Sequence, residues 1–376
     1  MDNPEIIWQP SSESKKLSNL SRFIQFANQR YSQTITTEYQ DVWDWSVNNV
    51  EKFWSLMWDF SEIKGIKGTK ISENIGRMPG ARFFPDAKLN YAENLLRAAD
   101  NTIAIEEFRE DGFSNALTRK ELESKALEMA SWMKSKGIKK GDRVCAYMPN
   151  CSETVITMLA TSALGAIFSS CSSDFGVEGV LDRFEQIEPK IMIAANGYLY
   201  NGKVIERSEE IKTISKRLPS LEHIIVVEYI SSTRSIDNFP NFNTVFQSDI
   251  LEKYVLCEFN DPLYIVFSSG TTGKPKCITH SIGGVLIQHA KEHLLHINLS
   301  EKQKMFYFTT CGWMMWNWLV GSLFCKSSIV LYEGSPFYPN PEHLWKIAEK
   351  SKVSIFGTSA KYIDALSKSN AVPKKH

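Results

Sequence analysis

The chain has 376 residues, of which 43% are hydrophobic, and its 43 basic residues balance its 43 acidic residues. This length exceeds one average domain, and the zero net charge gives no sign of nucleic acid or an anionic membrane as a partner. The seven cysteines are scattered without a C-x-x-C pair, which predicts free thiols in a reducing compartment, the cytosol, rather than a disulfide framework.

The first hundred residues differ in character from the rest. Residues 1–38 are polar and lack sustained periodicity, which predicts a loose leader. Aromatic side chains then become frequent, and apolar residues recur at helical spacing at Val50, Phe53, Trp54, Met57 and Trp58. We therefore predict a helix here whose wide apolar face packs inward. A turn-rich connector follows over residues 76–94.

From residue 103 onward, strands and helices are predicted to alternate. The predicted strands cover residues 103–107, 144–148, 166–169, 191–195, 224–227, 264–267, 305–308, 328–331 and 353–356. The predicted helices cover residues 118–137, 153–164, 177–187, 205–217, 281–295, 313–324, 341–350 and 359–367. This spacing implies right-handed crossovers and parallel sheets. We predict an α/β fold of two parallel-sheet layers that share a core, the second layer incomplete.

Two stretches without charged side chains approach the length of a membrane-spanning helix. They cover residues 154–173 and 305–325, and both are rich in hydroxyl groups. A glycine interrupts each of them, Gly165 in the first and Gly312 in the second. Broken, hydroxyl-rich segments span membranes poorly, so both stretches are predicted to be buried core.

The loop after the predicted strand 264–267 has a composition that suits a polyanion. Gly270 and Gly273 let backbone N–H groups approach phosphate oxygens without a Cβ in the way. Hydroxyl donors and positive charge come from the other predicted phosphate-binding residues, which are Ser268, Ser269, Thr271, Thr272, Lys274 and Lys276. A solvated turn is the simple alternative. A Walker A loop is excluded, because Pro275 follows the lysine where that motif requires Ser or Thr.

Residues 289–293 match the pattern H-x-x-E-H, an order found in some zinc hydrolases. A catalytic zinc site needs a third protein ligand, and no other histidine of the chain has a fitting spacing. The pattern is therefore interpreted as a polar helix face, and no metal site is predicted.

The loop Ser268–Lys276 closely resembles the signature S-S-G-T-T-G-x-P-K of the adenylate-forming superfamily, which includes acyl-CoA synthetases, nonribosomal adenylation domains and luciferases. Trp43–Ser46 with Phe53-Trp54 is similar to the N-terminal cap of acetyl-CoA-synthetase-like members, here residues 39–97. Residues 174–190 and 309–318 resemble more specifically the acetoacetate–CoA ligases, and the run Gly312–Trp318 is the most discriminating part. The resemblance assigns residues 98–376 to the AMP-binding domain.

The resemblance implies two half-reactions with small-molecule substrates. A carboxylate, acetoacetate, attacks the α-phosphorus of ATP–Mg²⁺, which gives an acyl-AMP and pyrophosphate. The thiol of CoA then displaces AMP. The first step depends mainly on positioning and on neutralising phosphate charge. The implied role is an acid–thiol ligase of lipid, fatty-acid and ketone-body metabolism.

The resemblance also assigns individual residues. The loop would hold the β- and γ-phosphates, and Trp313, Met314 and Met315 would line the acyl pocket, although apolar residues at this spacing also suit plain helix core. Gly165 aligns with a contact to CoA, and Lys203 stands where an acetyl-specific member has a phosphate-binding arginine. The chain departs from that pattern at Tyr200, where another arginine would be.

Family members continue for several hundred residues with segments that have no match here. Those segments carry the adenine and ribose contacts, a Thr-Glu that helps to hold Mg²⁺, and a lysine for adenylation. No catalytic residue and no metal ligand is therefore assigned in these 376 residues, which are expected to be an inactive fragment or short isoform. The alternatives are another short-chain acyl-CoA synthetase and a nucleotide-binding or interaction product without catalysis.

Overall fold

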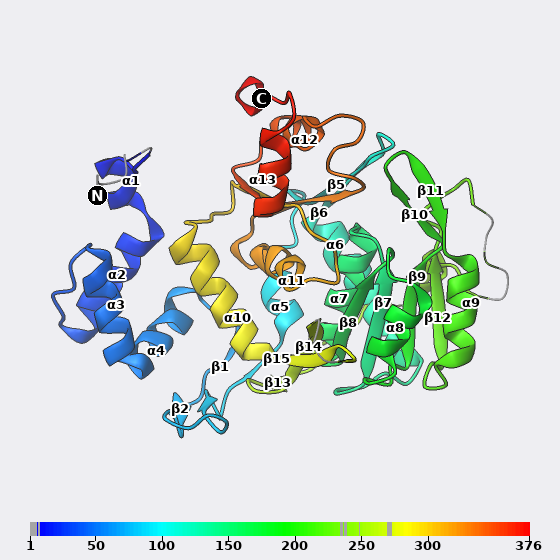
Figure 1. The fold of residues 1–376 in the computed structure, drawn as a ribbon. Coiled ribbons are helices and arrows are strands. Elements are labelled where there is room, and N and C mark those ends of the chain that lie inside the picture. The colour runs from blue at the N-terminus through cyan, green and yellow to red at the C-terminus, as the bar shows by residue number, and fades with distance from the viewer. Residues whose placement is uncertain (1–5, 7, 234–235, 237–238, 248, 269–272) are drawn as a thin grey trace.

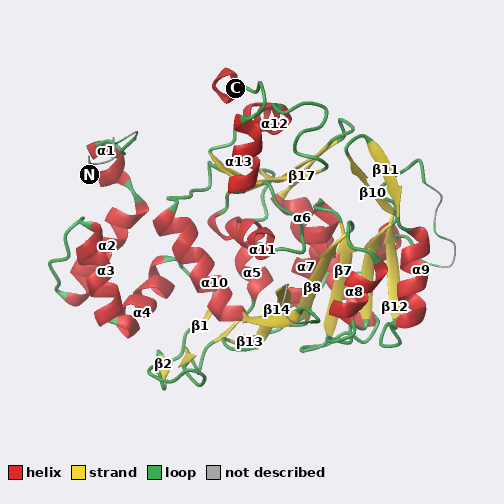
Figure 2. Ribbon diagram, viewed as in Figure 1, coloured by secondary structure: helices red, strands yellow, loops and turns green. Residues whose placement is uncertain are grey.

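Two β-sheets, with helices between and around them, organise the chain (Figure 1). The structure is a computed structural model that describes residues 6, 8–233, 236, 239–247, 249–268 and 273–376. Figure 2 shows the strands of the larger sheet side by side, with helices on both of its faces. An α/β fold was predicted, and the structure confirms it.

The larger sheet has six strands in the order β12-β9-β7-β8-β14-β15. Their bounds are β7 Arg143–Met148, β8 Ile167–Ser172, β9 Ile191–Ala195, β12 His223–Val227, β14 Pro262–Ser268 and β15 Lys276–Ser281. The first five are parallel, with Val144 opposite Phe168 and Phe168 opposite Tyr264. β15 runs antiparallel to β14 and was not predicted. The sheet is therefore mixed at the edge where the phosphate loop lies.

The smaller sheet has five strands in the order β18-β16-β17-β5-β6. Their bounds are β5 Ile103–Arg109, β6 Ser114–Thr118, β16 Lys304–Tyr307, β17 Ser328–Glu333 and β18 Ile355–Gly357. Only the pair β5–β6 is antiparallel. β5 lies beside β17, more than 200 residues away in the chain, so the second sheet includes the first strand of the domain.

Helices cover both sheets and fill the space between them. Their bounds are α5 Tyr91–Leu95, α6 Arg119–Ser135, α7 Ser152–Ala163, α8 Val177–Phe184, α9 Ser208–Arg217, α10 Ile282–Lys291, α11 Met314–Gly321, α12 His343–Lys350 and α13 Ala360–Ser367. Four short segments form helical turns: η1 Phe242–Gln247, η2 Glu292–His296, η3 Ser322–Cys325 and η4 Pro373–Lys375. The capping box of Thr118 and Glu121 begins α6, as the sequence indicated.

One core joins the two sheets. Val144 and Ala146 of the larger sheet and Ile105 and Leu331 of the smaller one belong to the same cluster of buried side chains. The two uncharged stretches lie in this core, as α7 with β8 and as β16 with α11 and η3. Within the described residues, no helix has the length and apolar character needed to cross a bilayer.

The loose leader expected over residues 1–38 is wrong for the part that the structure describes. Residues 12–31 form α1 Ser12–Leu17 and α2 Asn19–Tyr31, and Phe23 and Ala27 of α2 are buried. Phe23 packs edge-to-face against Phe53 and Phe60. The apolar residues of α2 do recur at helical spacing, at Leu20, Phe23, Ile24 and Ala27, and the sequence interpretation passed over this pattern within a polar segment.

The aromatic-rich segment forms the helices α3 Tyr39–Asn48 and α4 Val50–Phe60. The connector after α4 contains the short strands β1 Gly65–Ile66, β2 Ser72–Glu73, β3 Arg82–Phe83 and β4 Lys88–Leu89, and β4 also pairs with β13 Cys257–Glu258. The apolar face of α4 is buried, as predicted, at Phe53, Met57 and Trp58.

The helix predicted over residues 205–217 begins later, at Ser208. The residues before it form a hairpin of β10 Gly197–Tyr200 and β11 Lys203–Glu206. Asn201 and Gly202 make its two-residue turn, both with positive φ. Asn-Gly is a strong hairpin signal, and the sequence interpretation passed over it.

Candidate functional site

The predicted phosphate loop connects the last two strands of the larger sheet. Ser268 of β14 lies opposite Lys276 of β15, and this pair closes the ladder. Four predicted phosphate-binding residues lie outside the described residues, namely Ser269, Gly270, Thr271 and Thr272. The described part of the loop comprises Ser268 on one side and Gly273 to Lys276 on the other.

The two lysines of the loop have different surroundings. Lys274 Nζ lies 3.7 Å from Asp182 Oδ1 and 3.6 Å from Glu185 Oε2, at the C-terminal end of α8. Lys276 is exposed, and within the described parts of the chain it has no ion-pair partner. The charge of Lys276 is therefore more available to an incoming phosphate than the charge of Lys274.

The end of α8 also holds the outgoing arm of the loop. Gln186 Nε2 donates a hydrogen bond of 2.8 Å to the carbonyl oxygen of Pro275. At Gly273, no atom of the described residues other than its chain neighbours lies within 4 Å of the position that a Cβ would occupy. A phosphate can therefore approach this backbone closely, so the described residues fit the triphosphate of ATP.

A pocket of about 550 Å³ lies on the side of β15 that faces α10 and α11. Met314 and Met315, two of the three predicted acyl-pocket residues, line it. Trp313 does not line it and is 63% exposed. The other lining residues are Tyr264, Thr279, His280, Ser281, Gly284, Val285, Gln288, His289, Glu292 and Trp318. The pocket thus joins the strand that leaves the phosphate loop to the helix that carries the methionines.

One end of this pocket holds a fixed carboxylate. Trp318 Nε1 donates to Glu292 Oε2 at 2.7 Å, and Gln288 Nε2 donates to Glu292 Oε1 at 2.7 Å. These two hydrogen bonds fix the orientation of the carboxylate. The pocket therefore combines an adaptable methionine wall with a polar end.

The polar helix face expected for the H-x-x-E-H segment is wrong. His289 and His293 are both buried, and His293 Nε2 lies 3.0 Å from the carbonyl oxygen of Trp318. Burial lowers the pKa of His293 to about 4. Among the described residues, no group of three His, Cys, Asp or Glu side chains is placed to hold a metal ion. The histidines instead pack α10 and η2 against α11.

Gly165, the predicted contact to CoA, lies elsewhere. It follows α7 with φ +65°, and its N–H donates to the carbonyl oxygen of Ser162. It precedes β8, whereas the phosphate loop follows β14, and these two strands are parallel. Gly165 therefore lies at the opposite end of the strands from the phosphate loop. It is buried against Cys257, where it ends α7. Its assignment to CoA stays a prediction.

Lys203 is exposed on β11, opposite Tyr200 in the hairpin. The amides of Asn201 and Gly202 in the turn donate to Glu110 Oε2 and Oε1, at 3.0 and 2.7 Å. None of the described contacts joins Lys203 to another predicted site residue. Its assignment to the phosphate of CoA stays a prediction.

The sequence interpretation missed a buried polar cluster where the two sheets meet. The N–H of Asn150 donates to Glu333 Oε2 at 2.7 Å, and the N–H of Ser152 donates to Glu107 Oε2 at 2.9 Å. Burial raises the pKa of Glu333 to about 8 and that of Glu107 to about 7. Single Glu and Asn residues inside predicted strands and turns give no local signal of such a cluster.

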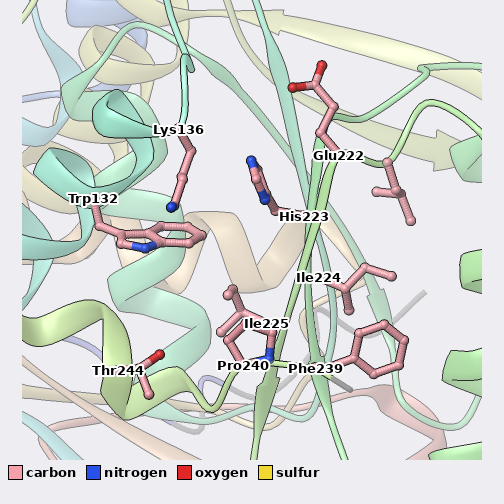
Figure 3. A pocket seen from close by; sticks show the side chains of 10 residues that line it. Trp132, Lys136, Glu222, His223, Ile224, Ile225, Phe239, Pro240 and Thr244 are labelled. Atoms are coloured by element: carbon pink, nitrogen blue, oxygen red, sulfur yellow. The ribbon is translucent and has the colours of Figure 1, made fainter. Parts of the chain in front are cut away.

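A different pocket, of about 540 Å³, lies at the far edge of the larger sheet (Figure 3). Figure 3 shows Trp132 and Lys136 from the end of α6 on one side and His223 of β12 on the other. β12 and β15 are the two outer strands of this sheet. No predicted site residue lines this pocket, so it is separate from the phosphate loop.

Comparison with known proteins places these features in one family. The family model described as AMP-binding enzyme matches residues 93–376, and the one described as acetyl-coenzyme A synthetase N-terminus matches residues 39–95. Acetoacetyl-coenzyme A synthetase of Rhizobium meliloti is 42% identical over 98% of this chain and 57% of its own length. Acetoacetyl-CoA synthetase of Gallus gallus is 39% identical over the same shares.

A solved structure agrees with these matches. Acetoacetyl-CoA synthetase from Streptomyces lividans superposes with a TM-score of 0.94 at 35% identity, over 99% of this chain and 58% of that one. The chain thus spans a little more than half the length of the relatives that it matches. The family model covers well over half of the 376 residues, and the chain therefore belongs to the AMP-binding enzyme family.

Proposed function

We propose that these residues form the phosphate-binding and acyl-binding part of an acetoacetate–CoA ligase. The reaction would be the ATP-dependent, AMP-forming activation of acetoacetate, followed by transfer of the acyl group to CoA. The observation that carries this proposal is the likeness, over 98% of the chain, to relatives named acetoacetyl-CoA synthetase. The arrangement of the site supports it, because β15 connects the phosphate loop to the pocket with Met314 and Met315.

Each part of the site would have a defined task. Lys276 and the backbone at Gly273 would neutralise and orient the β- and γ-phosphates, so that pyrophosphate leaves in line with the attacking carboxylate. The methionines would enclose the short acyl group, since their flexible thioethers fit small, irregular shapes. Mg²⁺ would accompany ATP and offset its negative charge, and we assign it no ligand among the described residues.

The setting we propose is lipid, fatty-acid and ketone-body metabolism in the cytosol. The scattered free cysteines support a reducing compartment, because Cys145, Cys151, Cys171 and Cys311 are buried thiols without a disulfide. Fractionation of cells that express the tagged protein measures this directly, and recovery with an organelle fraction would contradict it.

The substrate is tested with a chimeric protein. Residues 1–376 are joined to the C-terminal part of the Rhizobium meliloti relative that the match does not cover, and the intact relative serves as the positive control. AMP release is measured with ATP, Mg²⁺, CoA and either acetoacetate, acetate or propionate. We expect kcat/KM for acetoacetate to exceed the other two values at least tenfold.

Two results would contradict the proposal. Comparable kcat/KM values on all three acids would reject acetoacetate as the preferred substrate and favour a broader short-chain acyl-CoA synthetase. A chimera that unfolds cooperatively but releases no AMP with any acid, beside an active relative, would reject the ligase. Nucleotide binding without turnover would then favour a non-catalytic role.

A further inference from the structure

Asn150 lies where the larger sheet, the smaller sheet and α11 meet. It follows β7, and its side chain is 1% exposed. Its Oδ1 accepts a hydrogen bond of 2.9 Å from Trp316 Nε1. Its Nδ2 donates to the carbonyl oxygens of Thr309 and Tyr332, at 3.2 and 3.3 Å. One amide group therefore bonds to α11, to the segment before α11 and to β17.

Trp316 has few ways to satisfy its indole N–H except through Asn150. The side chain is fully buried, and its ring stacks on Phe168 of β8 with centroids 6.2 Å apart. An indole N–H that loses its acceptor inside a core costs the desolvation of that group, so the ring would have to move to find another acceptor. The ring belongs to the first turn of α11, so any movement would displace this turn.

The same turn of α11 carries the wall of the acyl pocket. Met314 and Met315 directly precede Trp316, and both line the pocket of about 550 Å³. The segment before them is also fixed, since Ser170 Oγ donates to the carbonyl oxygen of Cys311 at 2.6 Å. Asn150 does not line the pocket, and none of its described contacts reaches the phosphate loop. Its effect on the pocket therefore passes through the groups that it bonds, of which Trp316 lies in the first turn of α11.

We infer that Asn150 is a positioning residue that sets the methionine wall of the pocket through its bond to Trp316 Nε1. A shift of the first turn of α11 moves both methionine side chains. A less rigid methionine wall discriminates less between longer and shorter acyl groups. That the pocket holds an acyl group rests on the proposed function. The position of the methionine wall does not depend on that function, so it can be measured without enzymatic turnover.

The first measurement uses hydrogen exchange in the 376-residue chain. The variants are Asn150→Leu, Trp316→Phe and the double variant. The matched control is Asn196→Leu, because Asn196 is equally buried and exchanges two hydrogen bonds with the backbone of Ile230, while none of its described hydrogen bonds reaches α11. All proteins are compared in urea at equal free energy of unfolding, so that global stability cancels.

We expect Asn150→Leu to speed amide exchange in α11 at least tenfold, while Asn196→Leu leaves α11 unchanged. The double variant should regain at least threefold of the lost protection, since its residue 316 no longer has an indole N–H without an acceptor. Full recovery is not expected, because the carbonyl oxygens of Thr309 and Tyr332 still lack the donor that Asn150 supplied. Equal exchange in α11 for both asparagine variants would overturn the inference, and so would a double variant no better protected than Asn150→Leu.

The second measurement uses the chimeric ligase described above. We expect Asn150→Leu to lower the ratio of kcat/KM for acetoacetate to that for propionate at least fivefold, and the double variant to recover part of it. An unchanged ratio in an active variant would contradict the role in selectivity. A wild-type chimera without activity would count against the proposed function alone, while the exchange measurement still decides the position of α11.

Discussion

At the scale of single residues, the two lysines of the phosphate loop look alike in the sequence but have different surroundings in the structure. Both supply positive charge in the sequence, but within the part of the chain that the structure describes, only Lys274 lies beside carboxylates, those of Asp182 and Glu185. A lysine already near two negative charges adds less to the potential at the loop than an unpaired one. We therefore expect Lys276 to be the principal lysine of this loop for a triphosphate.

We expect Lys276→Ala to weaken binding of MgATP to the 376-residue chain more than Lys274→Ala does. The expected loss is about tenfold or more for Lys276, since a charge-assisted bond to phosphate contributes about 1.5–3 kcal/mol, and less than threefold for Lys274. Titration calorimetry at constant ionic strength measures both dissociation constants. A larger effect at Lys274 would show that this lysine leaves α8 when nucleotide binds.

The pKa of Glu333 predicts a dependence of stability on pH. Burial raises this pKa from the ordinary 4.5 to about 8, so between these values the folded chain holds a proton that the unfolded chain has lost. The free energy of unfolding should therefore fall as pH rises through this window, by a few kcal/mol. Buried His293 has the opposite trend at acidic pH.

The comparison with Glu333→Gln isolates this effect, because the histidines are the same in both proteins. The difference in unfolding free energy, wild type minus variant, should fall steadily from pH 5 to pH 8 and stay flat below the ordinary pKa of a glutamate. Urea denaturation at each pH measures it. A constant difference over the whole range would show that Glu333 ionises as an exposed glutamate does.

At the scale of elements, two consecutive helices end at a glycine with the same backbone conformation but different steric surroundings. Gly137 after α6 and Gly165 after α7 both have positive φ, at +82° and +65°. A Cβ on Gly137 would meet no atom within 4 Å, whereas one on Gly165 would lie 2.5 Å from Cys257 Sγ. The same backbone role therefore has two different steric settings.

We expect Gly137→Ala to cost about 1 kcal/mol, which is the cost of a non-glycine residue with positive φ. Gly165→Ala should cost about 2–4 kcal/mol, because Cys257 must also move. In the double variant Gly165→Ala with Cys257→Ala, part of this cost should disappear. Urea denaturation measures all four proteins. Equal costs at the two glycines would mean that the contact with Cys257 relaxes freely.

At the scale of the whole molecule, the two sheets and the N-terminal helices share one core. α10 contacts α4, α5 and α11, so the helices that line the pocket also connect the N-terminal segment to the rest. In Figure 1, α10 runs between the N-terminal helices and the larger sheet. The pocket is therefore built on a helix that packs against both the N-terminal segment and the rest of the core, which favours a fixed geometry.

We expect the 376 residues by themselves to bind MgATP but to release pyrophosphate more than tenfold more slowly than the intact Rhizobium meliloti relative. These residues match 57% of that relative's length, and each preorganised group that its remaining part supplies would contribute several kcal/mol of transition-state stabilisation. Pyrophosphate release with ATP, Mg²⁺ and acetoacetate measures this. A rate within tenfold of the relative would show that these residues suffice.

The sequence by itself determined the local structure. The alternation of strands and helices from Ile103 to the end, the capping box at Thr118 and the apolar face of α4 all depend on residues a few positions apart. Hydrophobic periodicity and capping act over such distances, so they are visible in a single sequence. The loop Ser268–Lys276 was found for the same reason, because its composition is contiguous.

Only the tertiary structure decided which distant residues meet. It paired β5 with β17, reversed β15 beside β14, and buried His289 and His293 between helices. It also placed Gly165 at the opposite end of the strands from the loop, and Asn150 against Trp316 and Glu333. Each of these depends on partners tens to hundreds of residues away, and the free energy of such contacts comes from burial and hydrogen bonds that no local pattern encodes.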